Sequence, residues 1–260
     1  KWYHKVAEFT DAPVYGWGLY YIAWVHYNTQ NWDGAVKGFV RVLDYSKNDA
    51  RGRVTFTEDA SKYLVRSWAE TGKPKEALAF FSRVAKGSEV MLLDNLAFYY
   101  AESSAYDKSN AVLDDLIEFA KEDAQMVKYL TLRLDNSYKL HDLDQTVHSA
   151  TMVGNALKQG SETGKKQRPQ LELLLAEIGS AFHAESERTL DDSTLEAAEK
   201  IYRIYGEHFE NGQHAYDMLH NHALALFQLA DRAETTSMKA RLSRQNDEEL
   251  RLKALAVTRW

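Results

Sequence analysis

Histidines near the carboxyl-terminal third are the first side chains of this sequence to test for metal chemistry. They are His214, His220 and His222. Side chains that are two positions apart on a helix point in directions about 200° apart. His220 and His222 therefore cannot bind one ion as an i, i+4 pair does. The chain has no His-Glu-x-x-His motif. We therefore expect these side chains to cap, pack or face water, and we predict no metal site.

Carboxylates form a second candidate group, because a pair of them could act as general acid and base. The candidates are Asp191, Asp192, Glu207 and Glu210. They lie in predicted turns or helix ends among many similar charges, which is typical of a solvated surface. No catalytic residue is predicted from them.

The stretch GSETGKK, residues 160–166, superficially resembles a phosphate-binding loop. That motif needs four residues between its glycines and a hydroxyl residue after the lysine. Here three residues separate Gly160 from Gly164, and Lys166 replaces the hydroxyl residue. The segment is interpreted as a linker between helices, and no cofactor is predicted.

Composition narrows the class of protein. The net charge is -6, and acidic and basic residues are mixed along the chain, so no basic face is available to bind nucleic acid. No apolar run approaches the roughly 20 residues that cross a bilayer. The chain has no cysteine and three prolines. Disulfides and thiolate metal sites are thereby excluded, and long helices are favoured.

An internal repeat of helix, turn and helix organises the chain. The first copy places Leu19, Ile22 and Ala23 on one helix, a polar turn at Gln30 and Asn31, and further apolar residues on a second helix. A corresponding order recurs along the sequence. The predicted copies occupy 17–47, 58–87, 91–122, 127–158, 170–210 and 214–245, the fifth with an enlarged turn through SERTLDDST. A single hairpin cannot bury both its faces, so an array of stacked neighbours is expected over 1–260.

These residues resemble the tetratricopeptide repeat, a unit of about 34 residues with Trp/Leu, Gly/Ala and Tyr in its first helix and Ala, Phe and Ala in its second. The resemblance implies an all-α fold, a right-handed α-solenoid of stacked antiparallel helix pairs. Unequal spacings and missing prolines between copies depart from the pattern. The opening KWYHKVAEFTDAPVYG and the tail EELRLKALAVTRW are expected to be helices of neighbouring repeats, so the chain is interpreted as part of a longer array.

Two phrases, YIAWVHYNTQNWDGAV and FENGQHAYDMLHNHALALFQLADRAE, are also similar to a divergent subgroup in large cell-envelope and gliding-motility proteins of bacteria. This similarity implies a scaffold at the cell envelope or at the cell pole. The compartment is left open by the residues themselves, with periplasm or cell envelope favoured over cytoplasm by the resemblance.

An aromatic row on the first helix is the most informative candidate site. Trp17, Tyr20, Trp24 and Tyr27 follow one another at spacings of 3, 4 and 3, beside the packing face of that helix. The tetratricopeptide resemblance implies that this row lines a concave groove together with Asn28, and that Lys62, Arg66 and Phe98 continue the groove. The alternative is that Trp24 and Tyr27 pack against the helix of a neighbouring repeat.

These observations predict a non-enzymatic scaffold that binds a peptide or helix of a partner protein in its groove. A structural spacer within a larger repeat protein is the first alternative. An enzyme on a helical scaffold is the second, and it would need converging carboxylates or histidines, which the sequence does not supply.

Overall fold

The computed structural model describes residues 3, 5, 8, 10, 14–48, 57–120, 123–158 and 162–257, without the side chains of 123–124, 158, 162–165 and 249–257. Within these residues every regular element is a helix, which confirms the all-α fold of paired helices. The chain divides into two compact units, residues 1–142 and 143–260. This division falls inside the predicted fourth repeat, 127–158.

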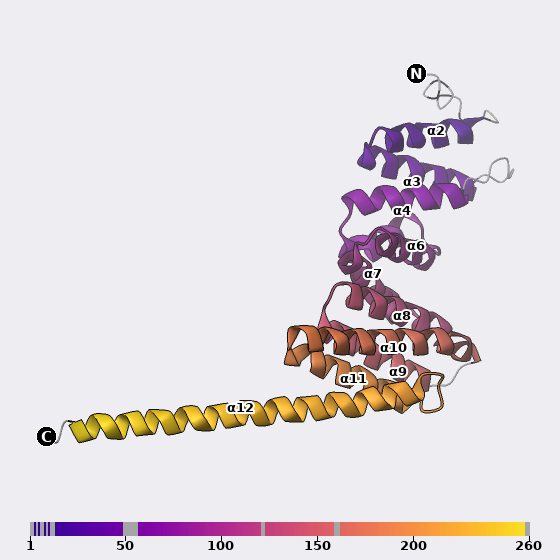
Figure 1. The fold of residues 1–260 in the computed structure, drawn as a ribbon. Helices are drawn as coiled ribbons and strands as arrows, with labels where there is room; N and C mark the ends of the chain where they lie inside the picture. Colours follow the sequence, from indigo (N-terminus) through magenta and orange to yellow (C-terminus); the bar gives the residue numbers. More distant parts are fainter. Residues whose placement is uncertain are drawn as a thin grey trace. The chain divides into compact units, whose positions relative to one another are not determined.

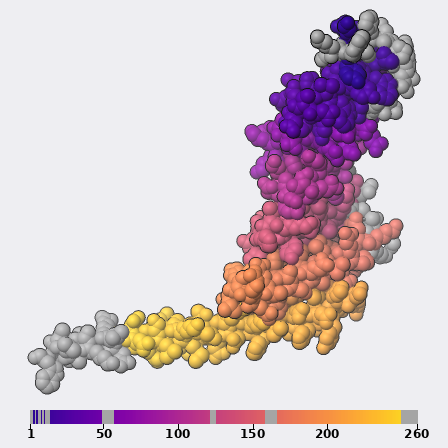
Figure 2. All heavy atoms as spheres, turned by 45° about the horizontal axis from the view of Figure 1, so that its top comes forward, coloured from indigo at the N-terminus to yellow at the C-terminus, as the bar shows by residue number. Residues whose placement is uncertain are grey.

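The first unit contains α2 (Tyr15–Asn28), α3 (Trp32–Asn48), α4 (Thr57–Thr71), the 3-10 helix η1 (Pro74–Glu76), α5 (Ala77–Val84), α6 (Glu89–Glu102), α7 (Tyr106–Phe119) and α8 (Asp123–Lys139). Helices that follow one another in sequence pack together, α2 on α3, α3 on α4, α6 on α7 and α7 on α8, while α4 also packs on α6 (Figure 1). The bands of colour in Figure 2 show the same succession within the unit. This is the expected arrangement of neighbouring hairpins.

Three turns of this unit share one backbone conformation. The second residue after α2, α6 and α8 has a positive φ, at Gln30 (56°), Ser104 (60°) and His141 (55°). In each turn the next backbone N–H donates to the carbonyl five residues earlier, as from Asn31 to His26. That bond satisfies a carbonyl at the helix end and reverses the chain within a few residues. The geometry therefore repeats even though the turn residues differ.

The core of the first unit is built from the apolar faces predicted by the repeat. Ala23, Ala35, Phe39, Ala77 and Phe81 are all fully buried. α2 and α3 approach each other closely at Gly38, because a Cβ there would lie 2.7 Å from the Cβ of Ala23. Small residues at this crossing let the two backbones approach, as the first repeat predicts for Ala23.

The second unit contains α9 (Leu143–Lys158), α10 (Glu162–Thr189), α11 (Asp192–His208) and α12 (Ala215–Val257). α11 lies at its centre and packs on α9, α10 and α12. Asp191 caps α11 by accepting hydrogen bonds from the backbone N–H groups of Ser193 and Thr194. The enlarged turn predicted in the fifth repeat is absent here, because helix continues through Thr189 and only two residues separate α10 from α11.

α12 differs from the prediction for the sixth repeat. From Ala215 onward the predicted hairpin of 214–245 is one uninterrupted helix, and the tail continues it instead of starting another. The physical reason is local: from Ala230 to Met238 the sequence offers no glycine, proline or asparagine to end a helix. Beyond Arg232 the described side chains of α12 are exposed.

No helix among the described residues combines the length and apolar character needed to cross a membrane.

Candidate functional site

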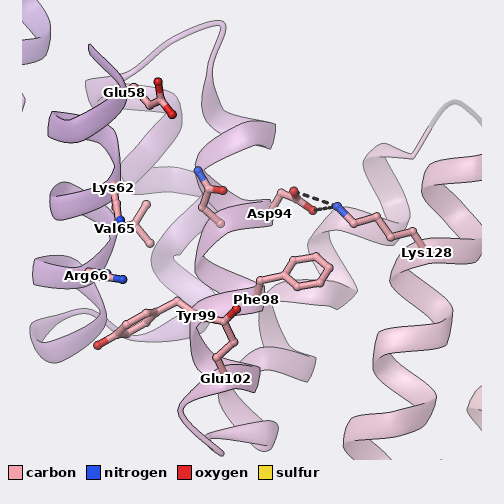
Figure 3. Close-up of a pocket in the computed structure, with 10 residues that line it drawn as sticks. Glu58, Lys62, Val65, Arg66, Asp94, Phe98, Tyr99, Glu102 and Lys128 are labelled. Carbon is pink, nitrogen blue, oxygen red and sulfur yellow. Dashed lines mark hydrogen bonds and ion pairs between the residues drawn. The ribbon is translucent and has the colours of Figure 1, made fainter. Parts of the chain in front are cut away.

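A hollow of about 460 Å³ lies between α4, α6 and α8 in the first unit (Figure 3). It brings together three of the predicted partner-binding residues, Lys62, Arg66 and Phe98. We call it the α4–α6 groove. Its lining is Glu58, Lys62, Val65 and Arg66 from α4, Asp94, Asn95, Phe98, Tyr99 and Glu102 from α6, and Lys128 from α8.

The sequence periods of α4 and α6 place these side chains in the groove. On α4, residues such as Leu64 and Trp68 are buried, which leaves Glu58, Lys62 and Arg66 on an outer row at spacings of four. α6 likewise buries its leucines, and its remaining face carries the groove residues. The buried α6 residues are Leu92, Leu93, Leu96, Ala97 and Tyr100.

Arg66 is held between two tyrosine rings. Its guanidinium carbon lies 5.8 Å from the ring centroid of Tyr63 and 5.8 Å from that of Tyr99. A cation over an aromatic face is attracted by the ring quadrupole. Burial raises the pKa of the Tyr99 phenol, and the nearby carboxylate of Glu70 raises it further, while Arg66 lowers it. Tyr99 therefore stays neutral near pH 7 and presents its ring to Arg66.

Lys128 closes the other side of the groove. Its ammonium donates to both carboxylate oxygens of Asp94, at 2.9 and 3.1 Å, and lies 4.5 Å from the ring centroid of Phe98. In Figure 3 the Phe98 ring extends toward α8, and the Tyr99 ring extends toward α4. Because Lys128 and Asp94 form this ion pair, their charges offset each other. Burial and the neighbouring Asp94 also raise the pKa of the Tyr129 hydroxyl to about 12.

Lys62 and Arg66 differ from Lys128 in their ion pairing. Neither forms an ion pair with any side chain in the described part of the chain. Lys62 is exposed and Arg66 is half-buried. A groove with aromatic faces and two unpaired cations is suited to a partner that brings apolar groups and carboxylates.

The aromatic row of α2 is divided between packing and exposure. Tyr20 is 8% exposed, and its ring lies 6.2 Å from that of Phe39 in the core. Trp17 is 44% exposed and stacks on Tyr21. Asn28 is exposed at the end of the helix. None of these α2 residues lines the α4–α6 groove.

Trp24 and Tyr27 pack against the neighbouring hairpin through Tyr63 of α4. The ring centroid of Tyr63 lies 4.5 Å from Trp24, 5.1 Å from Tyr27 and 5.8 Å from Phe39. The same Tyr63 ring also contacts Arg66. The aromatic residues of α2 therefore support the groove from behind by fixing the ring on which Arg66 rests.

The three histidines considered as metal ligands have different surroundings. His222 Nε2 lies 3.1 Å from a carboxylate oxygen of Glu199, His220 is exposed, and the backbone N–H of His214 donates to Glu172. Across the residues that the structure describes, no group of three or more His, Cys, Asp or Glu side chains is arranged to hold a metal ion.

The four carboxylates have separate surroundings. Asp191 caps α11, and Asp192 forms an ion pair with Arg232 at 3.0 Å. Glu207 and Glu210 line a second hollow of about 420 Å³ at the other end of α11. In the GSETGKK stretch, Gly160 lies outside the described residues, and so does the side-chain environment of 162–165.

Several groove or support residues were not predicted from the sequence, among them Tyr63, Tyr99 and Lys128. The repeat pattern also places Thr131, in the predicted copy 127–158, on the groove side, and Lys128 lies one turn before it. A cation one turn from that position was the available signal. Tyr63 adjoins Lys62 on the helix and lies on the side of α4 that faces α2.

Comparison of the chain with protein-family models, curated proteins and solved structures finds no match. The fold and the groove therefore rest on the chain's own geometry.

Proposed function

We propose that this chain is a non-enzymatic scaffold that binds a peptide or helix of a partner protein in the α4–α6 groove. The observation that carries the proposal is the pair of unpaired cations, Lys62 and Arg66, beside the half-buried rings of Phe98 and Tyr99. Aromatic anchors and arginine are the side chains that most often dominate binding energy at protein interfaces.

The helical repeat architecture supports this function, because stacked hairpins present extended surfaces for binding. We propose further that the repeats are tetratricopeptide-like and that the chain works within a bacterial envelope or motility complex. This part of the proposal rests on the sequence resemblance alone.

A peptide library displayed on phage provides the test. The chain serves as bait, and binders are counter-selected on the variant Lys62→Glu/Phe98→Ala. For a selected peptide, Phe98→Ala or Lys62→Glu alone should weaken binding at least about tenfold, which corresponds to about 1.4 kcal/mol. Fluorescence anisotropy measures the dissociation constants, and thermal melts verify that each variant folds.

Matched controls are available outside the groove. Phe119→Ala truncates an aromatic ring that is 43% exposed on α7, and Lys37→Glu reverses an exposed charge on α3. Both should leave binding within about twofold of the parent, since neither residue lines the hollow. A selection that yields only peptides insensitive to Lys62 and Phe98 would overturn the proposal.

A structural spacer remains the second candidate, and one observation favours it. Trp24 and Tyr27 are engaged by Tyr63 of the next hairpin, so part of the aromatic row serves packing. A spacer predicts that groove variants change no binding equilibrium, whereas the scaffold predicts the losses above.

A further inference from the structure

A row of four charged residues runs along α4, and its order is symmetrical. Glu58, Lys62, Arg66 and Glu70 follow one another at spacings of four. On a helix, successive members rise by about 6 Å and lie on one slowly winding row. Glu58, Lys62 and Glu70 are exposed, and Arg66 is half-buried. The order along the row is acidic, basic, basic, acidic.

None of the four residues is neutralised by an ion pair within the described residues. Glu58 could reach Lys62 along the helix, and Arg66 could reach Glu70, yet neither bond is made. Arg66 instead lies against the rings of Tyr63 and Tyr99. As far as the described residues show, these charges are available to a partner; Glu58, Lys62 and Arg66 line the groove, and Glu70 follows one turn later on α4.

The opposite wall of the groove reinforces this order. Asp94 and Lys128 bind each other and add little net charge at the middle of the groove. Glu102 of α6 lies at the end of the groove away from Glu58, as Figure 3 shows. The groove is thus acidic at its ends and basic on α4 between them.

We infer that the α4–α6 groove selects its partner segment by charge order, basic, acidic, acidic, basic, with about 6 Å between successive charges. Opposite charges would then meet at all four positions of α4, while the reverse order would place like charges together. A helix provides this spacing with a charge at every fourth residue, and an extended strand with a charge at every second residue. The inference rests on the proposed function, since it names the partner chemistry of the same groove.

Synthetic peptides of identical composition test the inference. One peptide carries Lys, Glu, Glu and Lys at every fourth position, and its isomer carries Glu, Lys, Lys and Glu there, so that both have the same net charge. A second pair repeats both orders at every second position. In at least one pair the Lys-Glu-Glu-Lys member should bind at least about tenfold more tightly, as measured by anisotropy at low salt, and added salt should reduce the preference.

A charge-inverted protein completes the test. The variant Glu58→Lys/Lys62→Glu/Arg66→Glu/Glu70→Lys should reverse the preference between the two isomers, while Lys37→Glu should leave it unchanged. Circular dichroism checks that the fourfold variant remains helical. If it does not fold, a variant with only Lys62→Glu and Arg66→Glu takes its place, and this paired variant should abolish the preference.

Equal binding of both isomers in both formats would overturn the charge-order inference, and so would a preference that the paired variant leaves intact. The proposed function has a separate outcome. Library-selected peptides that depend on Phe98 but show no such charge order would leave the groove as a binding site and reject the order alone.

Discussion

Replacing Tyr63 tests whether the aromatic row of α2 acts through the groove helix. The ring of Tyr63 contacts Trp24, Tyr27 and Phe39 at centroid distances of 4.5, 5.1 and 5.8 Å. Truncating a buried Phe or Trp to Ala costs about 3–5 kcal/mol. Tyr63 is half-buried. We therefore expect Tyr63→Ala to lower the free energy of unfolding of the first unit by about 2–3 kcal/mol.

Tyr63→Phe should behave differently, because it keeps the ring and its contacts. Among the residues that the structure describes, the Tyr63 hydroxyl makes no hydrogen bond, so its loss should cost less than about 0.5 kcal/mol. The same two variants distinguish the effect of the ring on peptide binding from the effect of the hydroxyl. Tyr63→Ala should weaken peptide binding by removing the ring that supports Arg66, and Tyr63→Phe should not.

Urea denaturation followed by tryptophan fluorescence is the assay. Of the six tryptophans only Trp260 falls in the second unit, so in a Trp260→Phe background the emission reports unfolding of the first unit. A double-mutant cycle with Trp24→Ala should show a coupling of about 0.5–1.5 kcal/mol. A loss below about 1 kcal/mol for Tyr63→Ala, or equal losses for the Ala and Phe variants, would refute the packing argument.

Three further predictions concern stability. Gly38→Ala should lower the free energy of unfolding by about 1–3 kcal/mol, because the new Cβ would press on Ala23. Gly206→Ala places its Cβ in open space and should raise that free energy by about 0.5–1 kcal/mol. Urea melts of both variants check this contrast. Asp191→Ala should cost about 1 kcal/mol by removing the cap of α11, and a melt equal to the parent's would contradict the cap. Burial alone would raise the pKa of Glu172, but hydrogen bonds from a tyrosine hydroxyl and backbone N–H groups outweigh it and hold the pKa below its ordinary value of 4.5. Stability from this group is therefore present above pH 4.5 and lost as pH falls through the lowered folded pKa; urea melts of Glu172→Gln across acidic pH should show a weaker pH dependence than the parent.

The sequence predicted the helical pairs because their signals are local. Apolar residues at helical spacing identified buried positions such as Phe39 and Phe81, and polar turns placed the reversals at Gln30 and Ser104. Lys62, Arg66 and Phe98 share a groove because the repeat puts equivalent positions of neighbouring hairpins side by side.

Other features depend on contacts that periodicity does not encode. Tyr63 serves packing because its ring meets α2, which a single helix pattern cannot show. The long α12 was predicted as a hairpin because its apolar residues match the repeat, although the stretch from Ala230 to Met238 has no glycine, proline or asparagine to end a helix. The division of the chain into two units after Asp142 was also not predicted from the composition. The partner-binding role of the predicted residues stays a prediction.

The turns with positive φ after α6 and α8 make these two groove helices adjustable from their ends. Gln30, Ser104 and His141 occupy a backbone region that only glycine adopts without steric cost. α6, which carries most of the groove lining, and α8, which carries Lys128, both end in such a turn. The strain therefore favours fraying of the last turn of each helix. A single glycine at Ser104 would shift the local opening equilibrium of α6 near Glu102 without replacing any groove residue, and hydrogen exchange would measure that shift.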